Sequence, residues 1–206
     1  MISEEFFNVF LVQGLDERMK AIRETVQPEF EILGEQLVLF LESKCNQKFY
    51  AHVAQHRRRT KYAPEITWCA FSQQKRGYKM EPHFQIAVNK DYLALWLSFI
   101  DNPKGEEKMA ATFIKNPKKI LTIPADFDVS LDHTITKTEK VGATDIIKDL
   151  QRWKNVKKGE FQIGKVFPKE FFKKKTNEEF LLESDTVFAK LIPIYQEAIG
   201  AVKGNI

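Results

Sequence analysis

The stretch HFQIAVNKDYLALWLSFI, residues 83–100, indicates the fold of this chain more clearly than any other segment. In its first part, the alternation predicts a strand with Phe84, Ile86 and Val88 facing the core. The polar side chains between them, His83 and Gln85, would then lie on the opposite face. Residues 92–100 are apolar in both phases, as expected for a strand covered on both sides. Because turn residues separate the two runs, we predict two adjacent antiparallel strands.

The same pattern extends outward from this stretch. Short runs rich in aromatic and β-branched residues occupy 49–54 and 66–71, again bounded by turn residues. Downstream, residues 127–131 alternate as a strand with one face in solvent, and residues 161–167 indicate a further strand. We therefore predict a mostly antiparallel sheet of about five or six strands.

Helices are predicted at both ends of the chain and between the strands. Pro28 suits the first turn of the second N-terminal helix. Thr176 and Glu179 form a capping box before the last helix, which Pro193 should kink or end. Together these elements predict an α+β fold, with residues 1–206 in a single domain. The predicted helices cover residues 15–26, 28–44 and 105–116, and two more begin near Thr144 and Asn177. Residues 6–12 fit either a short strand or a helical turn.

Composition is that of an ordinary globular protein. Hydrophobic residues make up 43% and charged residues 29% of the 206 residues, so the chain can bury a core without disulfides or metals. Cys45 and Cys69 have no metal-ligand spacing, and we expect no disulfide. No segment resembles a signal peptide or reaches the length of about 20 apolar residues that a membrane helix needs. We expect a cytoplasmic protein that has no cofactor and does not bind membranes.

Charge is distributed unevenly along the chain. Residues 44–90 carry ten basic and two acidic side chains, whereas residues 1–43 carry three basic and nine acidic ones. Such asymmetry points to an anionic partner, although a solvated basic face without a ligand would show the same pattern. The functional hypothesis requires that the acidic N-terminal helices leave this positive charge unneutralised.

Two basic segments are the main candidates for ligand contacts. Arg57, Arg58 and Arg59 are consecutive, and planar guanidinium groups suit phosphate recognition. Tyr78 lies among cations and could stack on a base or sugar, unless it packs back on the sheet. The candidate ligand-binding residues are Arg57, Arg58, Arg59, Lys61, Lys75, Arg76, Tyr78, Lys79, Lys157 and Lys158.

Topology limits how these segments can combine. In a simple meander, the loops near residues 57 and 77 lie at opposite ends of the sheet. One shared binding surface therefore requires a crossover or a long loop that folds back.

Histidines are the only plausible acid–base or metal-binding set, and the candidates are His52, His56, His83 and His133. His52 and His56 would share a face only in a helix, whereas this stretch reads as a strand passing into a loop. Asp132 could orient the imidazole of His133 or join a metal shell. Scattered histidines are more often surface or hydrogen-bonded residues, so we predict no metal site. The sequence also contains no GxSxG, P-loop, GxGxxG or HExxH motif.

Several segments are similar to those of the YktB-like family, a bacterial family of unknown function found mainly in Gram-positive species. They are HVAQHRRR (52–59), KRGYKMEPHFQI (75–86), SLDH (130–133) and NVKKGEF (155–161), with VQGLDERM (12–19) near the start. The resemblance spans nearly the whole chain with the segments in the same order. It implies a single-domain cytoplasmic α+β protein and assigns no catalytic residues.

The residues leave three functions open. The first is a non-enzymatic binding module for an anionic ligand, such as nucleic acid, a nucleotide or a phosphorylated small molecule. The second is a small-molecule enzyme in which the histidines act as acid–base or metal groups and the cations bind substrate. The third is a protein–protein adaptor. The oligomeric state stays undetermined.

Overall fold

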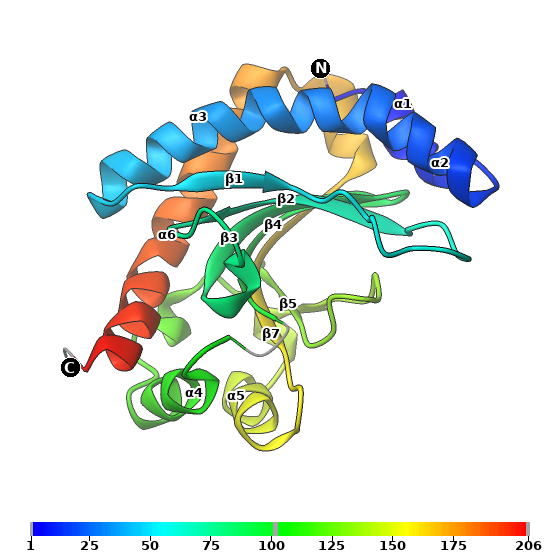
Figure 1. Ribbon diagram of the computed structural model, residues 1–206. Coiled ribbons are helices and arrows are strands. Elements are labelled where there is room, and N and C mark those ends of the chain that lie inside the picture. Colours follow the sequence, from blue (N-terminus) through cyan, green and yellow to red (C-terminus); the bar gives the residue numbers. More distant parts are fainter. Residues whose placement is uncertain (1, 101–102, 205–206) are drawn as a thin grey trace.

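A seven-stranded antiparallel sheet forms the centre of the computed structural model, which describes residues 2–100 and 103–204 (Figure 1). The strand order is β1-β2-β3-β4-β7-β5-β6, so a four-strand meander is followed by β7, which pairs with both β4 and β5. The strands are β1 (Tyr50–Val53), β2 (Ile66–Ser72), β3 (His83–Asn89), β4 (Tyr92–Phe99), β5 (Asp128–Ser130), β6 (Glu139–Lys140) and β7 (Phe161–Pro168). The predicted α+β class is confirmed. The two-residue strand β6 was missed because two residues show no alternation.

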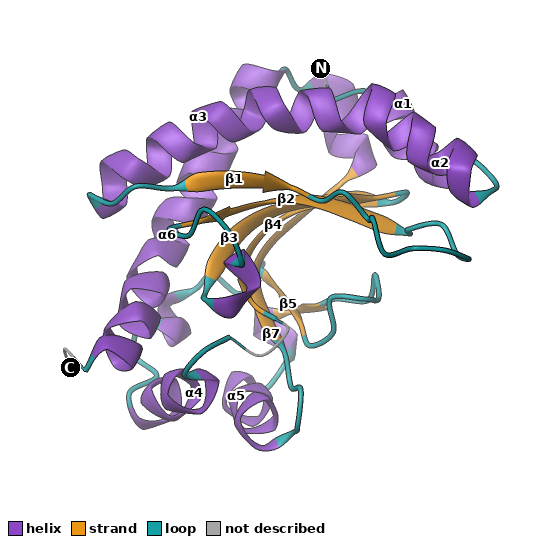
Figure 2. Ribbon diagram, viewed as in Figure 1, coloured by secondary structure: helices purple, strands orange, loops and turns teal. Residues whose placement is uncertain are grey.

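Helices cover one face and one end of the sheet (Figure 2). Helix α3 packs on β1 and β2, α6 packs on β4 and β7, and α4 packs against both α5 and α6. The α-helices are α1 (Glu4–Asn8), α2 (Leu15–Ala21), α3 (Gln27–Cys45), α4 (Glu106–Lys115), α5 (Ile146–Asn155) and α6 (Asn177–Lys203). A π-helical segment η2 (Ile22–Val26) joins α2 to α3, and the 3-10 turns are η1 (Val9–Leu11), η3 (Tyr78–Met80), η4 (Ile120–Thr122), η5 (Val141–Ala143) and η6 (Lys169–Lys174).

The main core lies between the sheet and these helices. Phe84 of β3 contacts Phe188 and Tyr195 of α6, with ring centroids 5.1 and 4.9 Å apart. Gly34 of α3 lies against Phe71 of β2. The apolar phase of residues 83–88 points into this core as predicted, and the other phase, with His83 and Gln85, is also buried.

The opposite face of the sheet, which we call the open face, carries the alternate residues. Strand register places Trp68, Ala87, Ala94 and Val166 in one row across β2, β3, β4 and β7. Ala87, Ala94 and Trp96 form a small apolar cluster that is separate from the main core. This face, covered by loops instead of helices, is where polar side chains can be brought together.

The structure corrects the predicted exposure of β5 and narrows the prediction made for Pro193. Asp128 and Ser130 of β5 are only 2% and 5% exposed, although their face was predicted to lie in solvent. Asp128 is buried because its carboxylate accepts hydrogen bonds from Lys140 Nζ and the Val166 backbone N–H, both at 2.9 Å. Of the two outcomes expected at Pro193, a kink or an end, the end does not occur: helix α6 continues to Lys203, since buried residues on both sides of the proline offset its cost.

Other expectations are confirmed more simply. The capping box at Thr176 and Glu179 is present at the start of α6. The uncertain stretch near residue 6 is helical, in α1 and η1. Cys45 and Cys69 are both free thiols. Among the described residues, no helix combines the length and the apolar character that crossing a bilayer requires.

Candidate functional site

The loop that joins β2 to β3 folds back over the open face. Gly77 has a left-handed φ of 75° and begins the 3-10 turn that carries Tyr78. Glu81 closes the loop, because its carboxylate accepts hydrogen bonds from the Gln73 backbone N–H (2.9 Å) and the Gln74 side-chain amide (3.3 Å). The first four strands do form a meander, which would place the loops near residues 57 and 77 at opposite ends of the sheet. The loop near residue 77, however, returns across the sheet.

The folded loop meets the indole of Trp68 on β2. Trp68 Nε1 donates a hydrogen bond to the Tyr78 hydroxyl oxygen at 2.7 Å. The Lys79 ammonium lies 5.4 Å from the centroid of the indole ring, within range of a cation–π interaction. The loop near residue 77 therefore reaches Trp68. The loop near residue 57, which was expected at the opposite end of the sheet, meets it there.

The loop between β1 and β2 brings the arginines to the same place. His56 has a left-handed φ of 49°, and its carbonyl accepts the Arg59 backbone N–H at 3.0 Å. Arg57 and Arg58 thus occupy the corner of a turn, where their side chains are exposed. The Arg59 guanidinium also donates to the backbone carbonyl of Tyr62 at 3.4 Å.

A groove of about 530 Å³, which we call the Trp68 groove, lies between these loops. Its lining residues are Ala54, Gln55, His56, Arg57, Arg58, Arg59, Trp68, Tyr78 and Lys79. A second hollow of about 350 Å³, the Tyr62 hollow, shares Arg59 and Trp68 with the groove. Its other lining residues are Tyr62, Ala63, Glu65, Ile66, His133 and Thr134.

The arginines of the groove are not neutralised by direct contact with acidic groups. No carboxylate in residues 2–100 or 103–204 forms an ion pair with any of the three. The acidic N-terminal helices pair elsewhere, as Glu24 does with Lys20 (3.9 Å) and Glu42 with Lys48 (2.9 Å). The charge of residues 44–90 is therefore neutralised in part, at Lys48, while Arg57, Arg58 and Arg59 keep no ion-pair partner among the described residues.

Five of the ten predicted ligand-binding residues do not line the Trp68 groove. Lys75 lies over the ring of Tyr50, and Arg76 lines a different hollow beside α6. Lys61 lies over the exposed ring of Tyr62. Lys157 and Lys158 are exposed before β7 and belong to neither the groove nor the Tyr62 hollow.

Two of the four predicted histidines contact Tyr78. The His52 ring stacks on it at 5.1 Å, and the His83 ring meets it edge-on at 5.0 Å. His52 Nε2 donates to the Gln74 carbonyl at 2.8 Å, and His83 Nδ1 donates to the Glu81 carbonyl at 3.0 Å. These two imidazoles hold the folded loop in place.

The other two histidines contact Trp68. The His56 ring lies edge-on to the indole at 5.3 Å, and His56 Nε2 lies 2.9 Å from the Thr67 hydroxyl oxygen. The His133 ring lies edge-on at 6.4 Å, with Nδ1 at 2.8 Å from both carboxylate oxygens of Glu160. All four histidines therefore surround one hydrogen-bonded aromatic pair, which their spacing in the sequence did not indicate.

Burial keeps two of these imidazoles neutral. It lowers the pKa of His83 to about 4. Burial, followed by the positive charges of Arg59 and Lys79, lowers the pKa of His56 to about 4. A base with so low a pKa is poorly matched to proton abstraction at neutral pH. These groups are better suited to hydrogen bonding than to acid–base catalysis.

The low pKa of His83 predicts a loss of stability in acid. Between about pH 6.5 and pH 4, the unfolded chain binds a proton at this imidazole that the folded chain excludes. The neutral His83 side chain should therefore make its full contribution to the free energy of unfolding above about pH 6.5. This contribution should fall by up to about 3 kcal/mol as the pH drops to about 4. We expect the difference in free energy of unfolding between wild type and His83→Gln, measured by urea unfolding, to shrink by that amount over the same pH range. Parallel pH profiles of the two proteins would contradict the assignment.

Sequence reasoning missed the central aromatic residues of the site. Trp68 was interpreted as part of an apolar run, because the sequence does not show which side chains of the neighbouring strands lie beside it on the open face. Tyr62 is 69% exposed and follows Lys61, so the criterion that selected Tyr78, an aromatic ring among cations, would also have selected it.

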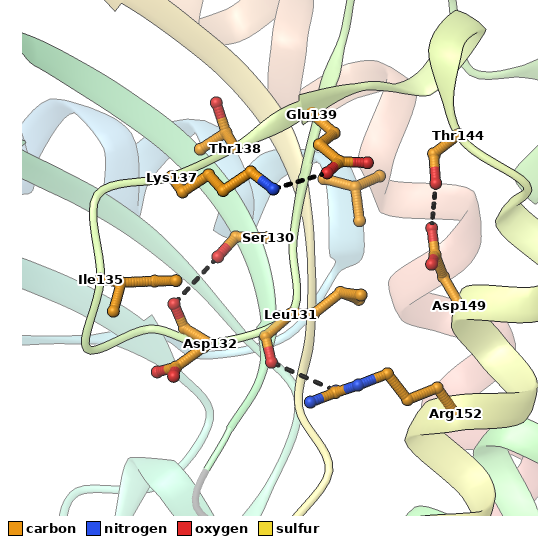
Figure 3. Close-up of a pocket in the computed structure, with 11 residues that line it drawn as sticks. Ser130, Leu131, Asp132, Ile135, Lys137, Thr138, Glu139, Thr144, Asp149 and Arg152 are labelled. Atoms are coloured by element: carbon orange, nitrogen blue, oxygen red, sulfur yellow. Dashed lines mark hydrogen bonds and ion pairs between the residues drawn. The ribbon is translucent and has the colours of Figure 1, made fainter.

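Another pocket, of about 280 Å³, lies between the chain after β5 and helix α5 (Figure 3). Its charged side chains already have partners: Lys137 pairs with Glu139 at 3.1 Å, and the Thr144 hydroxyl donates to Asp149 at 2.7 Å. Burial raises the pKa of Asp149. Because the three carboxylates of Asp132, Glu139 and Asp149 line this pocket beside only two cations, it is a weaker candidate for an anion than the Trp68 groove.

Comparison with known proteins identifies relatives along almost the whole chain. Residues 2–195 match the family model described as a domain of unknown function, DUF1054. A UPF0637 protein of Enterococcus faecalis is 44% identical over 199 residues, which cover 97% of this chain and 98% of that protein. The UPF0637 protein YsbB of Lactococcus lactis is 42% identical over 96% of this chain and 98% of its own length. A Listeria innocua UPF0637 protein is 37% identical over 96% and 97%.

Proposed function

The chain belongs to the DUF1054 family, whose function is unknown, and we propose on the basis of its site that it is a non-enzymatic binding protein for a phosphorylated ligand with a planar ring. A nucleotide or single-stranded nucleic acid has this chemistry. One observation carries the proposal: three arginines that pair with no carboxylate among the residues the structure describes border the same groove as a partly buried tryptophan.

Phosphate is the group that the arginine turn suits best. A guanidinium group can donate two parallel hydrogen bonds to a phosphate, and an exposed guanidinium without an ion pair gives up no carboxylate partner when it does so. Arg57, Arg58 and Arg59 are consecutive on one turn, so their charges act together within a Debye length of about 8 Å. The neutral imidazole of His56 beside them adds hydrogen-bonding capacity without repelling the cations.

The planar part of the ligand would contact Trp68 and Tyr62. The indole of Trp68 borders both hollows, and the ring of Tyr62 borders one of them. Stacking of a base on an aromatic side chain contributes about 1–3 kcal/mol. Tyr78, the stacking residue suggested by the sequence, already stacks on His52 and accepts a hydrogen bond from Trp68, so it supports the site instead.

Intrinsic fluorescence provides a direct test, because Trp96 and Trp153 are only 2% and 0% exposed while Trp68 borders the groove. We expect oligothymidylate or ATP to quench the fluorescence of Trp68, and Trp68→Phe to lose the change. For three phosphate contacts on a single strand, raising NaCl from about 50 to about 200 mM should weaken binding about 20-fold. The absence of quenching, or an affinity that does not depend on salt, would contradict the proposal.

An acid–base or metal-dependent enzyme is the second candidate, favoured by the convergence of four histidines on Trp68 and Tyr78. Three of them are weakened as bases, because burial lowers the pKa of His52 as it does those of His56 and His83. His133 differs in contacting a carboxylate at the edge of the Tyr62 hollow. Loss of phosphoesterase activity in His133→Ala, if wild type has such activity, would support this alternative.

A further inference from the structure

We propose that Asp132, His133 and Glu160 bind a divalent metal ion at the edge of the Tyr62 hollow. One potential donor atom from each residue lies within 4.8 Å of the other two. Among the described residues, this is the one group of three or more histidine, cysteine, aspartate or glutamate side chains with such an arrangement. The inference stands independently of the ligand proposed above.

The three donors come from two segments that the sheet brings together. Asp132 and His133 follow β5, and Glu160 directly precedes β7, its partner strand. The His133 and Glu160 side chains are 16% and 12% exposed, so the group is sheltered but reachable from solvent. Asp132 lines the pocket of Figure 3 and His133 lines the Tyr62 hollow, which places the group between the two.

Both carboxylates are already oriented by hydrogen bonds. Asp132 Oδ1 accepts the Thr134 backbone N–H at 2.8 Å and the Thr134 hydroxyl at 2.6 Å. Glu160 Oε2 accepts the His133 backbone N–H at 2.8 Å. One oxygen of each carboxylate is thus held by a backbone N–H, as second-shell contacts hold metal ligands. Glu160 Oε1 contacts His133 Nδ1 at 2.8 Å, so a metal ion would replace the proton between these two donor atoms.

The donor set selects the class of ion. One imidazole nitrogen with two carboxylate oxygens suits Zn²⁺ or Mn²⁺, whereas Mg²⁺ prefers oxygen ligands alone. The hydrogen bonds from Thr134 are the main cause of the lowered pKa of Asp132, so this group is ionised at neutral pH. Zn–N and Zn–O bonds of about 2.0–2.2 Å would require the 2.8 Å contact between His133 and Glu160 to open slightly and the Nδ1 proton to leave. Three protein donors leave coordination positions for water or a ligand.

The test is calorimetric titration of untagged, chelator-treated, full-length protein with Zn²⁺ alone and Mn²⁺ alone. We expect one equivalent of metal per chain, with proton release shown by a dependence of the heat on buffer ionisation enthalpy. Asp132→Asn and Glu160→Gln should each weaken binding about 10- to 100-fold, and His133→Gln should abolish it.

Controls separate a specific site from incidental binding and from misfolding. Glu170→Gln removes an exposed carboxylate of η6 outside the group and should bind metal as wild type does. Circular dichroism should show that the site variants remain folded. A sub-stoichiometric or absent heat in wild type, or equal affinity in wild type and the site variants, would show that His133 and Glu160 form only a structural ion pair. The titration contains metal but no organic ligand, so a failure to bind metal would not count against ligand binding in the Trp68 groove.

Discussion

Replacing Arg57, Arg58 and Arg59 together by glutamine is expected to weaken the binding of fluorescein-labelled oligothymidylate by about 10- to 100-fold. The three guanidinium groups are exposed, so each contact with phosphate is worth only about 0.5–1 kcal/mol, and the effect is the sum of the three. The slope of log affinity against log salt should become less negative by about 2. Fluorescence anisotropy at low salt measures both quantities.

A charge-matched control distinguishes a site from general attraction to a positive protein. Lys115, Lys118 and Lys190 are exposed and line neither the Trp68 groove nor the Tyr62 hollow. Their replacement by glutamine removes the same charge, but we expect an affinity within about twofold of wild type, because distant exposed charges are screened. Equal weakening in the two triple variants would mean that net charge alone drives binding. An unchanged affinity in the arginine variant would remove the proposed function.

Replacing Gly164 by alanine is expected to lower the free energy of unfolding by about 3 kcal/mol or more. Gly164 lies in β7 between β4 and β5, where a Cβ atom would come within 1.8 Å of the Leu95 carbonyl oxygen and 2.8 Å of the Trp96 ring. Since the nearest atom belongs to the backbone of the central sheet, the strands must separate to admit the methyl group. Urea unfolding should show the loss, and thermal unfolding should show a midpoint lower by about 10 °C.

The same substitution at Gly34 should have the opposite sign. A Cβ atom there would meet Ala51 Cβ and the Phe71 ring at 3.6 Å and Cys69 Sγ at 3.7 Å, which are ordinary van der Waals distances. Gly34 lies inside helix α3, where alanine restricts the unfolded chain and favours helix, so we expect a gain of about 0.5–1 kcal/mol. If both variants were equally destabilised, steric contact with Leu95 would not explain the Gly164 result.

Local pattern predicted most of the secondary structure, and the reasons lie in particular segments. The apolar phase of residues 83–88 and the capping box at Thr176 are properties of a few neighbouring residues. The structure confirms that the first lies in the main core and that the second is present. The exposure of Asp128 was predicted wrongly because its partners, Lys140 and Val166, are 12 and 38 residues away along the chain. Burial of a polar group depends on such distant partners, which periodicity does not reveal.

The candidate site was predicted in its components but not in its assembly. The sequence alone determined the α+β class, the family and the concentration of arginine near residue 58, because composition, periodicity and family segments are all local features of the chain. Only the tertiary structure decided that Tyr78 returns across the sheet to Trp68 and that Glu160 reaches His133. These meetings depend on a loop closed by Glu81 and on the pairing of β5 with β7. Contacts between residues far apart in the chain are set by the packing of the whole fold.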